Sequence, residues 1–274
     1  MTAPAPPPIP HPAFAPYAPL LRAFASAGDV PDLATLNRCA AARGLALPDG
    51  RPLVFSAAPR VRPAALDYER GIAASGVVPT RAGSLHDACN ALAWLALPRT
   101  KGVLNALHAA TAAVPSPNGR DRRRDAATLL DESGLLVACA DASLLALWRA
   151  RSWRALFWDR RADVARTVRV VALGHGLLAK LRQPYRALAA HALVLPVPAA
   201  ALPEDPVALA AALDGVAAAW LTDHAAALTP GDLLPLPVAA LPGWDGENLG
   251  VRLFDDATVF RPLRGARGPS PASC

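Results

Sequence analysis

The sequence predicts an α+β domain in which a small antiparallel or mixed sheet, built from hairpins, packs against several helices. Two observations support this fold class. Segments with helical periodicity and clear helix caps are separated by short apolar runs of strand length. These runs flank turn-forming residues. The strands of a parallel α/β sheet would alternate regularly with helices, and these runs do not.

Helices are indicated by their caps. Residues 31–44 and 63–76 each begin near a proline and end at a glycine. Ser84, followed three residues later by Asp87, resembles a capping box and starts a helix that Pro98 must end or kink. Four more helices are expected over residues 99–113, 142–161, 175–182 and 206–228.

Strands are indicated by apolar runs beside turns. The segment DESG at residues 131–134 lies between two such runs and predicts a hairpin with a four-residue loop. A second hairpin is expected where residues 251–254 and 257–260 flank two aspartates. Two single strands are expected over residues 167–173 and 191–197.

Size and composition fit one large domain with short appendages. The chain has 274 residues, 53% of them hydrophobic, which is enough for a substantial core. We expect a Pro-rich leader over residues 1–16 that is extended or loosely docked, a single α+β domain over 17–264, and a flexible tail over 265–274.

Several protein classes are disfavoured by the sequence. Proline or charge interrupts every apolar run before the length of about 20 residues that a membrane span needs. The N-terminus has no positive charge before Arg22 and no continuous apolar stretch, unlike a secretory signal, so we expect the cytoplasm. The four cysteines form no C-x-x-C pair, and no common nucleotide-binding, zinc-protease or nucleophile-elbow motif occurs. No particular oligomeric state is indicated.

The chain is basic, with 28 Lys and Arg against 22 Asp and Glu and a net charge of +6. Such an excess fits a nucleic acid or a phosphorylated ligand. It also fits the codon usage of a genome rich in G and C, which favours alanine, arginine, proline and glycine. Charge alone therefore does not identify a partner.

Polar residues interrupt a helix that is otherwise apolar on all sides. His86 and Asn90 share one face of this helix and Asp87 lies beside them. Because a helix that is apolar all round is buried, these groups need partners. His86 is thus either a proton-transfer group or ligand oriented by Asp87, or a core histidine with satisfied hydrogen bonds.

The next helix carries an unusual polar stripe. Lys101, Asn105 and His108 recur at i, i+4 and i+7 with no acid to pair the lysine, and Arg99 stands beside them. If the two helices fold back on each other, this stripe lines one side of an anion-binding cleft and the polar face of the first helix lines the other. The alternative is an ordinary solvated helix face.

Three further regions are candidates. Asp125, Asp131 and Glu132 could bind a divalent metal or divide acid and base roles, although the last two could simply build the hairpin turn. His175 lies between two glycines at a strand end, and Trp244 lies in a turn that could contact substrate. Arginines at positions 120, 122, 123 and 124 could meet phosphates or form an exposed charged loop.

Several ordered segments over residues 68–264 resemble an uncharacterised bacterial family that is known only as a domain of unknown function. The resemblance implies a bacterial, proteobacterial protein in which these polar positions matter, but it implies no activity or cofactor. Leu85 departs from the aromatic residue expected there, which argues against a stacking role. The matching positions are His86 and Asp87, residues 98–101, Asn105, His108, residues 131–134, Gly174, His175 and residues 242–244.

Together these observations favour a hydrolase that acts on a phosphate-bearing or other anionic substrate. His86 or His108 would transfer protons, and Arg99 and Lys101 would neutralise developing negative charge. Asp131 with Glu132 or Asp125 would orient a histidine or hold a divalent metal. This hypothesis requires that the side chains lie within about 10 Å of one another.

Two other hypotheses remain open at this level. The chain could be a non-catalytic binding protein that contacts a nucleic acid, a nucleotide or a protein partner through its basic loop and Trp244. The polar positions could instead form buried networks that stabilise the fold, in which case no pocket would collect them.

Overall fold

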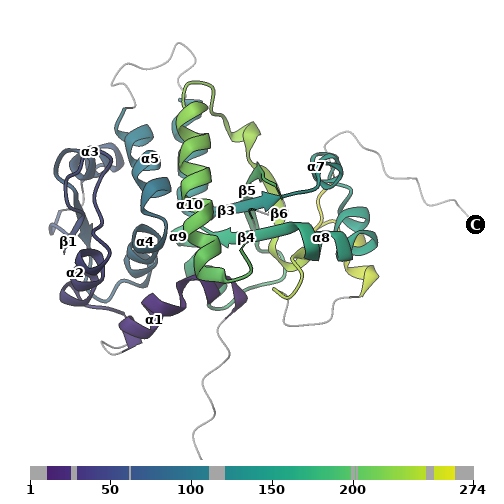
Figure 1. The fold of residues 1–274 in the computed structure, drawn as a ribbon, viewed down its shortest axis with the longest axis horizontal. Coiled ribbons are helices and arrows are strands. Elements are labelled where there is room, and N and C mark those ends of the chain that lie inside the picture. The colour runs from purple at the N-terminus through teal and green to yellow at the C-terminus, as the bar shows by residue number, and fades with distance from the viewer. Residues whose placement is uncertain are drawn as a thin grey trace, which may run out of the picture.

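A four-stranded mixed sheet and a separate two-stranded parallel sheet are surrounded by helices in the computed structural model of the protein (Figure 1). The structure describes residues 11–25, 30–61, 63–110, 121–198, 201, 203–244 and 250–262. The α+β fold class is confirmed, with a sheet that is mixed and not purely antiparallel.

The larger sheet has the strand order β4-β3-β5-β6. Its central strand, β3, pairs antiparallel with β4 and parallel with β5, and β5 pairs antiparallel with β6. The predicted strands near residues 167–173 and 191–197 correspond to β4 and β5, whereas β6 was not foreseen. The strand bounds are β3 Gly134–Cys139, β4 Val168–Ala172, β5 Ala189–Pro196 and β6 Leu234–Pro237.

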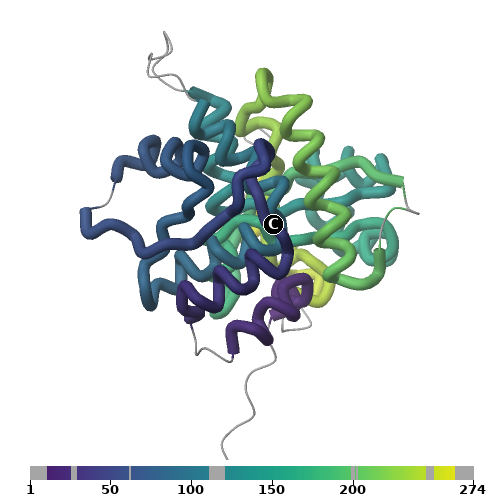
Figure 2. The backbone as a smooth tube through the Cα atoms, turned by 60° about the vertical axis from the view of Figure 1, so that its left-hand side comes forward, coloured from purple at the N-terminus to yellow at the C-terminus, as the bar shows by residue number. Residues whose placement is uncertain are grey.

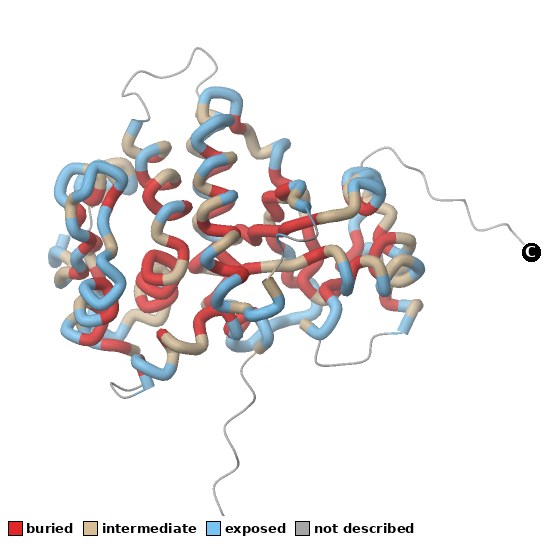
Figure 3. The backbone as a smooth tube through the Cα atoms, viewed as in Figure 1, coloured by how far each residue is buried: buried red, intermediate tan, exposed pale blue. Residues whose placement is uncertain are grey.

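Strand β3 is buried along its whole length because both faces of the sheet are covered. Its side chains alternate between two apolar cores, as the two-residue period of a strand requires. Leu135 and Val137 belong to the core shared with α4 and α9, while Leu136 and Ala138 belong to the core shared with α6 and α10. Figure 3 shows the resulting layer of buried residues through the middle of the molecule.

The smaller sheet pairs β1 with β2 in parallel and lies at one end of the molecule with α2 and α3 (Figures 1 and 2). Gly76 ends α3 in the left-handed conformation, as the sequence predicts, whereas α2 begins at Leu33, two residues after the expected Pro31, and the Asp32 side chain caps it. The two strands were not predicted. The bounds are β1 Val54–Ala57, β2 Val77–Thr80, α2 Leu33–Ala42 and α3 Ala65–Ser75.

Two predicted helices meet at Pro98 and form the centre of the molecule. Ser84 caps α4 by accepting a hydrogen bond from the Asp87 amide, and α4 runs over Leu85–Ala96. Pro98 then occupies the first turn of α5, Pro98–Ala109, where its missing N–H costs nothing.

The hairpin predicted around residues 131–134 is wrong. The segment before the turn is helix α6, Arg122–Ser133, which leads directly into β3. The Asp121 side chain caps α6 by accepting from the amides of Arg123 and Arg124. The apolar run counted as a strand is the buried face of this helix, with Ala126, Ala127 and Leu130 at helical spacing.

The single helix predicted over residues 142–161 is also wrong. It breaks after Arg149, and Arg151 adopts a positive φ of 51°. The indole N–H groups of Trp148 and Trp153 donate to carbonyls of different segments, those of Pro235 and Arg261, so one straight helix would not satisfy both. The three resulting pieces are α7 Ala142–Arg149, the π-helical turn η2 Ala155–Asp159 and α8 Arg161–Thr167.

The second hairpin, expected over residues 251–260, is likewise absent from the described part of the chain. Residues Val251–Asp255 form a 3-10 helix, η6, and the Asp256 side chain accepts from the Thr258 amide at 2.9 Å to make a local turn. Such side-chain turns compete with strand pairing.

The end of the expected leader is packed and not loose. Residues Pro12–Tyr17 form the 3-10 helix η1, and Phe14 and Tyr17 are buried. The Tyr17 hydroxyl donates to the carbonyl of Ala172 at the end of β4. Residues 1–10 and the predicted tail lie outside the described residues. The remaining elements are α1 Ala18–Ala25, α9 His175–Leu181, α10 Pro206–Asp223, η4 Pro230–Asp232 and η5 Val238–Ala240.

Helix α10 starts where predicted and ends five residues earlier. Among the described residues it is the one helix long and apolar enough to cross a membrane. One side of it, including Leu213, Ala217 and Leu221, is buried against the larger sheet and α5. We therefore interpret α10 as a core helix.

The N-terminus of α5 is capped by Asp214 of α10, because Leu97 has no side-chain acceptor. The buried Asp214 carboxylate accepts from the Thr100 amide at 2.8 Å and from the Arg99 amide at 3.1 Å. The Thr100 hydroxyl donates to the Asp214 carbonyl at 3.1 Å. Through these bonds α10 fixes where α5 begins.

We expect Asp214→Ala to lower the free energy of unfolding by about 1–3 kcal/mol, because it leaves amides at the start of α5 without an acceptor. Asp214→Asn keeps one acceptor oxygen and should lower it less. Urea denaturation of the three proteins measures the difference. Equal stability of the alanine variant and the wild type would contradict the capping role.

Candidate active site

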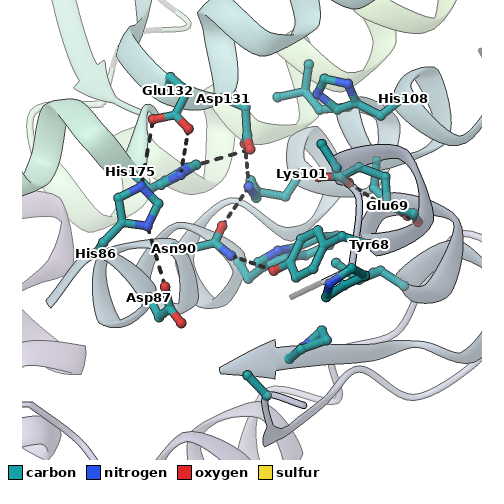
Figure 4. Close-up of a pocket in the computed structure, with 18 of the residues that line it drawn as sticks. Tyr68, Glu69, His86, Asp87, Asn90, Lys101, His108, Asp131, Glu132 and His175 are labelled. Atoms are coloured by element: carbon teal, nitrogen blue, oxygen red, sulfur yellow. Dashed lines mark hydrogen bonds and ion pairs between the residues drawn. The ribbon is translucent and has the colours of Figure 1, made fainter. Parts of the chain in front are cut away.

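A cavity of about 300 Å³ lies between α3, α4, α5, α6 and the start of α9. One part of its lining is apolar and includes Leu66, Ile72, Trp94 and Leu104. The other part is densely polar, with side chains from sequence-distant helices pointing toward one another (Figure 4). The ionisable side chains that line it are Arg60, Tyr68, Glu69, Arg81, His86, Asp87, Lys101, His108, Arg124, Asp131, Glu132 and His175.

Two histidines converge on one carboxylate at the end of the cavity drawn on the left of Figure 4. The Nε2 atom of His175 lies 3.4 Å from Oε1 of Glu132, and Nε2 of His86 lies 3.8 Å from Oε2 of the same side chain. The imidazole rings are 4.5 Å apart between centroids and nearly perpendicular. His175 is buried, whereas about half of the His86 and Glu132 side chains is exposed.

Local structure explains how the three side chains meet. The Ser84 cap places His86 in the first turn of α4, Glu132 lies in the last turn of α6, and His175 is the first residue of α9. Helix α9 follows β4, which pairs with β3, and β3 follows α6. The start of α9 therefore lies next to the end of α6.

This junction requires glycine. A Cβ atom on Gly174 would lie 2.4 Å from the Gly134 nitrogen and 2.6 Å from the Ser133 nitrogen. A Cβ atom on Gly176 would lie 2.7 Å from Oε2 of Glu132. The glycines on either side of His175 therefore permit the backbone of α9 to touch the end of α6.

Each histidine also faces a second carboxylate through its other nitrogen. Nδ1 of His86 lies 3.5 Å from Oδ1 of Asp87, and Nδ1 of His175 lies 3.6 Å from Oδ2 of Asp131. Asp87 is held in turn by Arg81, whose Nη2 and Nε donate at 2.6 and 2.9 Å, and Asp131 forms an ion pair with Lys101.

Lys101 is a buried cation that connects three walls of the cavity. Its Nζ pairs with Asp131 of α6 and donates to Oδ1 of Asn90 of α4 at 2.9 Å. The ammonium also lies 5.3 Å from the ring centroid of Trp94. The Asn90 amide faces the Tyr68 hydroxyl of α3 at 3.4 Å. The predicted Lys-Asn-His stripe is therefore buried and not solvated.

The acidic groups of the cluster are held in the ionised form. The contacts with His175 and then His86 lower the pKa of Glu132 well below its ordinary range. Burial acts to raise the pKa of Asp87, but bonds from Arg81 outweigh it and lower that pKa to about 2. Burial also acts to raise the pKa of Asp131, but Lys101 and His175 outweigh it, so this pKa is lowered as well.

The opposite end of the cavity favours uncharged groups. Burial raises the pKa of Glu69, whose Oε2 accepts from the Asn105 amide nitrogen at 2.7 Å. Burial lowers the pKa of His108, and Lys101 and Arg124 act in the same direction while Asp131 opposes them. One carboxyl group and one imidazole are thus biased toward their neutral forms.

Besides Arg124 of the basic run, nine of the residues singled out in the sequence line the cavity, and the structure brings these nine together from four helices. Arg99 does not join them, because its side chain is exposed on the side of α5 that faces Gly215 of α10. Trp244 packs edge-on against His11 instead, and Asp125 is exposed on α6. The nine are His86, Asp87, Asn90, Lys101, Asn105, His108, Asp131, Glu132 and His175.

Several residues that line the cavity were not predicted from the sequence as site residues. Tyr68 and Glu69 belong to a helix interpreted only by its caps, although two polar residues on its half-buried face were a usable signal. Arg81 precedes the α4 cap and had no helical pattern to mark it. Arg124 belongs to the predicted basic run and does reach the cavity, whereas Arg122 and Arg123 are exposed. Residues 111–120 are outside the described part of the chain.

Comparison with known proteins gives one match. The family described as "Protein of unknown function (DUF3025)" matches residues 53–264, slightly more than the range over which the sequence resembles a domain of unknown function. No curated protein and no solved structure matches the chain.

We expect Gly174→Ala to destabilise the protein by roughly 1–3 kcal/mol or more, because the new methyl group would overlap backbone atoms of α6 and β3. Gly71→Ala in α3 is the matched control. Its Cβ would meet no atom within 4 Å, so it should stabilise the helix by about 0.5–1 kcal/mol. Thermal unfolding of both variants provides the comparison, and similar shifts in the two would contradict the close approach.

Proposed function

The chain belongs to the DUF3025 family, which assigns it no activity, and we propose from the site that it is a hydrolase acting on a phosphate-bearing or other anionic substrate. The observation that carries this proposal is the convergence of six ionisable candidates from four helices on one cavity. These six residues form a chain of ion pairs, in which Lys101 pairs with Asp131 and the four contacts between a histidine and a carboxylate measure 3.4 to 3.8 Å; they are His86, Asp87, Lys101, Asp131, Glu132 and His175.

The cluster of His86, Glu132 and His175 is suited to activate water. An ionised carboxylate between two imidazoles can orient a water molecule and accept its proton as the oxygen attacks an electrophilic phosphorus or carbon. The partly exposed Glu132 side chain gives solvent access to this point. The cluster is thus the proposed position of the nucleophile.

The proton for the leaving group is assigned to Glu69. Paired carboxyl groups whose pKa values are displaced in opposite directions commonly divide base and acid roles. The pKa of Glu132 is lowered by its histidine partners, and that of Glu69 is raised by burial. In this assignment the bond to the leaving group breaks as its oxygen takes the proton from Glu69.

Two arginines that line the cavity would bind the negative charge of the substrate. Arg81 and Lys101 are engaged by Asp87 and Asp131. Arg60 and Arg124 also line the cavity, and within the described ranges neither has an acidic ion-pair partner. Their guanidinium groups are therefore the ones available to an anionic group, while the apolar wall suits an organic part of the substrate.

The alternative of a binding protein for nucleic acid, nucleotide or protein is less well supported. Trp244 packs on His11 and does not line the cavity that Arg124 reaches. The purely structural alternative predicted that no pocket would collect the polar residues, and a pocket does collect them. A cytoplasmic location and a bacterial source remain part of the proposal.

We expect Glu132→Gln to lower kcat/KM by about 100-fold or more, because it removes the carboxylate between the two histidines. Asp125→Asn on the same helix is the matched control and should leave the rate unchanged, since Asp125 is exposed outside the cavity. Suitable probes are p-nitrophenyl phosphomonoesters, phosphodiesters and a neutral p-nitrophenyl ester. Equal rates in both variants, or hydrolysis of the neutral ester alone, would contradict the proposal.

Arg124→Ala should raise KM for the anionic probes about tenfold with little change in kcat, because it removes a charge-assisted contact to bound substrate. Arg123→Ala is the control, since Arg123 is its exposed neighbour on α6. If the two variants weaken substrate binding equally, the general basic charge of the protein and not the cavity is responsible. A steep salt dependence shared by both would favour the binding-protein alternative.

A further inference from the structure

We propose that His86, Glu132 and His175 bind one divalent transition metal ion, with Zn²⁺ the best fit to the set of ligands. Each side chain offers one ligand atom, and the three atoms lie within 4.8 Å of one another. The inference rests on the proposed function for its role in catalysis, because it names the cofactor of that site. Binding of the ion itself can be tested separately.

The two imidazoles approach the Glu132 carboxylate at distances close to the ligand separations of a tetrahedral site. Nitrogen and oxygen ligands about 2.0–2.2 Å from a tetrahedral ion are about 3.3–3.6 Å apart. The His175 Nε2 to Glu132 Oε1 distance is 3.4 Å, and the His86 Nε2 to Glu132 Oε2 distance is 3.8 Å. The two contacts are to different oxygens of the carboxylate, so the side chains would have to close on one ion from separations of at most 4.8 Å.

The orientation of both imidazoles also fits a metal site. Each ring directs Nε2 toward Glu132 and Nδ1 toward a different carboxylate, that of Asp87 or Asp131. Metal-binding histidines commonly donate their second N–H to a carboxylate, which fixes the tautomer that leaves the other nitrogen unprotonated. Here that arrangement occurs twice around one central carboxylate.

The outer carboxylates are themselves held in place. Arg81 binds Asp87 with two donors, and Lys101 binds Asp131 from a buried position. A cation behind each carboxylate keeps it ionised and oriented toward the ring. The hydrogen-bond partners of metal-binding histidines need both properties. Ordinary surface ion pairs between histidine and glutamate do not need such a second layer.

The buried Nδ1 atom of His175 is a further observation that supports an ion at this site. The His175 side chain is only 8% exposed, and its Nδ1 is buried without a hydrogen bond to any of the residues that the structure describes. It lies 3.6 Å from Asp131, just beyond hydrogen-bonding distance. Buried polar groups are normally satisfied, so a ring shift that accompanies binding at Nε2 and brings Nδ1 onto Asp131 would remove this cost.

The ligand types select the class of ion. Two imidazole nitrogens and one carboxylate suit Zn²⁺ or another divalent first-row transition metal, whereas Mg²⁺ and Ca²⁺ prefer oxygen ligands. Three protein ligands leave a fourth position for water, which is typical of catalytic and not structural zinc. With the ion bound, Glu132 would be a ligand and not the base, because a water on such an ion loses its proton to solvent near neutral pH and would supply the nucleophile of the proposed hydrolysis.

The experiment measures metal binding to the full chain after treatment with EDTA. Isothermal titration with Zn²⁺, and the visible spectrum after addition of Co²⁺, report stoichiometry and coordination. We expect one ion per chain and a four-coordinate Co²⁺ spectrum. His86→Ala and Glu132→Gln should weaken binding at least about 100-fold, and Asp87→Asn about 10–100-fold.

Two control variants separate this site from adventitious binding. His224→Ala removes an exposed histidine of the chain, and Asp125→Asn removes an exposed carboxylate of α6, so both should bind Zn²⁺ like the wild type. His86 and Glu132 are partly exposed, so their variants should fold, which circular dichroism verifies. Less than one bound ion in the wild type, or equal binding by all variants, would overturn the proposal.

The outcomes for the ion and for the activity are distinguishable. Binding of one Zn²⁺ that depends on His86 and Glu132, without hydrolysis of any probe, supports the metal site and contradicts the proposed function. Hydrolysis that persists at full rate in the EDTA-treated protein, with no ion bound, supports the proposed function and overturns the metal site.

Discussion

The backbone contact between the start of α9 and the end of α6 is the constraint on which the site depends. The amides of Leu173 and Gly174 both donate to the Gly134 carbonyl, at 3.0 and 2.9 Å. Gly174 lies so close to the junction of α6 and β3 that no side chain fits between them. Because this contact is made by backbone, it sets the position of His175 relative to Glu132 without relying on flexible side chains.

The other walls are fixed to this junction by buried polar contacts. Lys101 joins α5 to α6 through Asp131 and to α4 through Asn90. Asp214 determines where α5 begins and therefore where Lys101 lies along it. Buried ion pairs contribute little net stability because desolvation opposes them, but a broken pair is costly, so such contacts favour one arrangement of the helices over others.

The electrostatics of the cavity follow from this pairing and not from the net charge of the chain. Two of its cations, Arg81 and Lys101, are neutralised by carboxylates, and these carboxylates face the two imidazoles. Arg60 and Arg124 line the same cavity and have no acidic ion-pair partner among the described residues. A basic composition alone would suggest a surface that binds any polyanion, whereas the structure separates a reactive cluster from groups able to hold a charged substrate.

The sequence by itself determined the α+β class, the glycine that ends α3, the Ser84 cap of α4, the start of α10, and most of the polar residues of the cavity, because caps, periodicity and unmatched polar groups are local signals. It misassigned residues 126–130 as a strand and residues 131–134 as a hairpin loop, since a short apolar run fits a buried helix face as well as a strand. Only the tertiary structure decided which carboxylate meets which histidine. Glu132 and His175 are 43 positions apart, and their meeting depends on β3 pairing with β4 and on the space that Gly174 leaves, which no local pattern records.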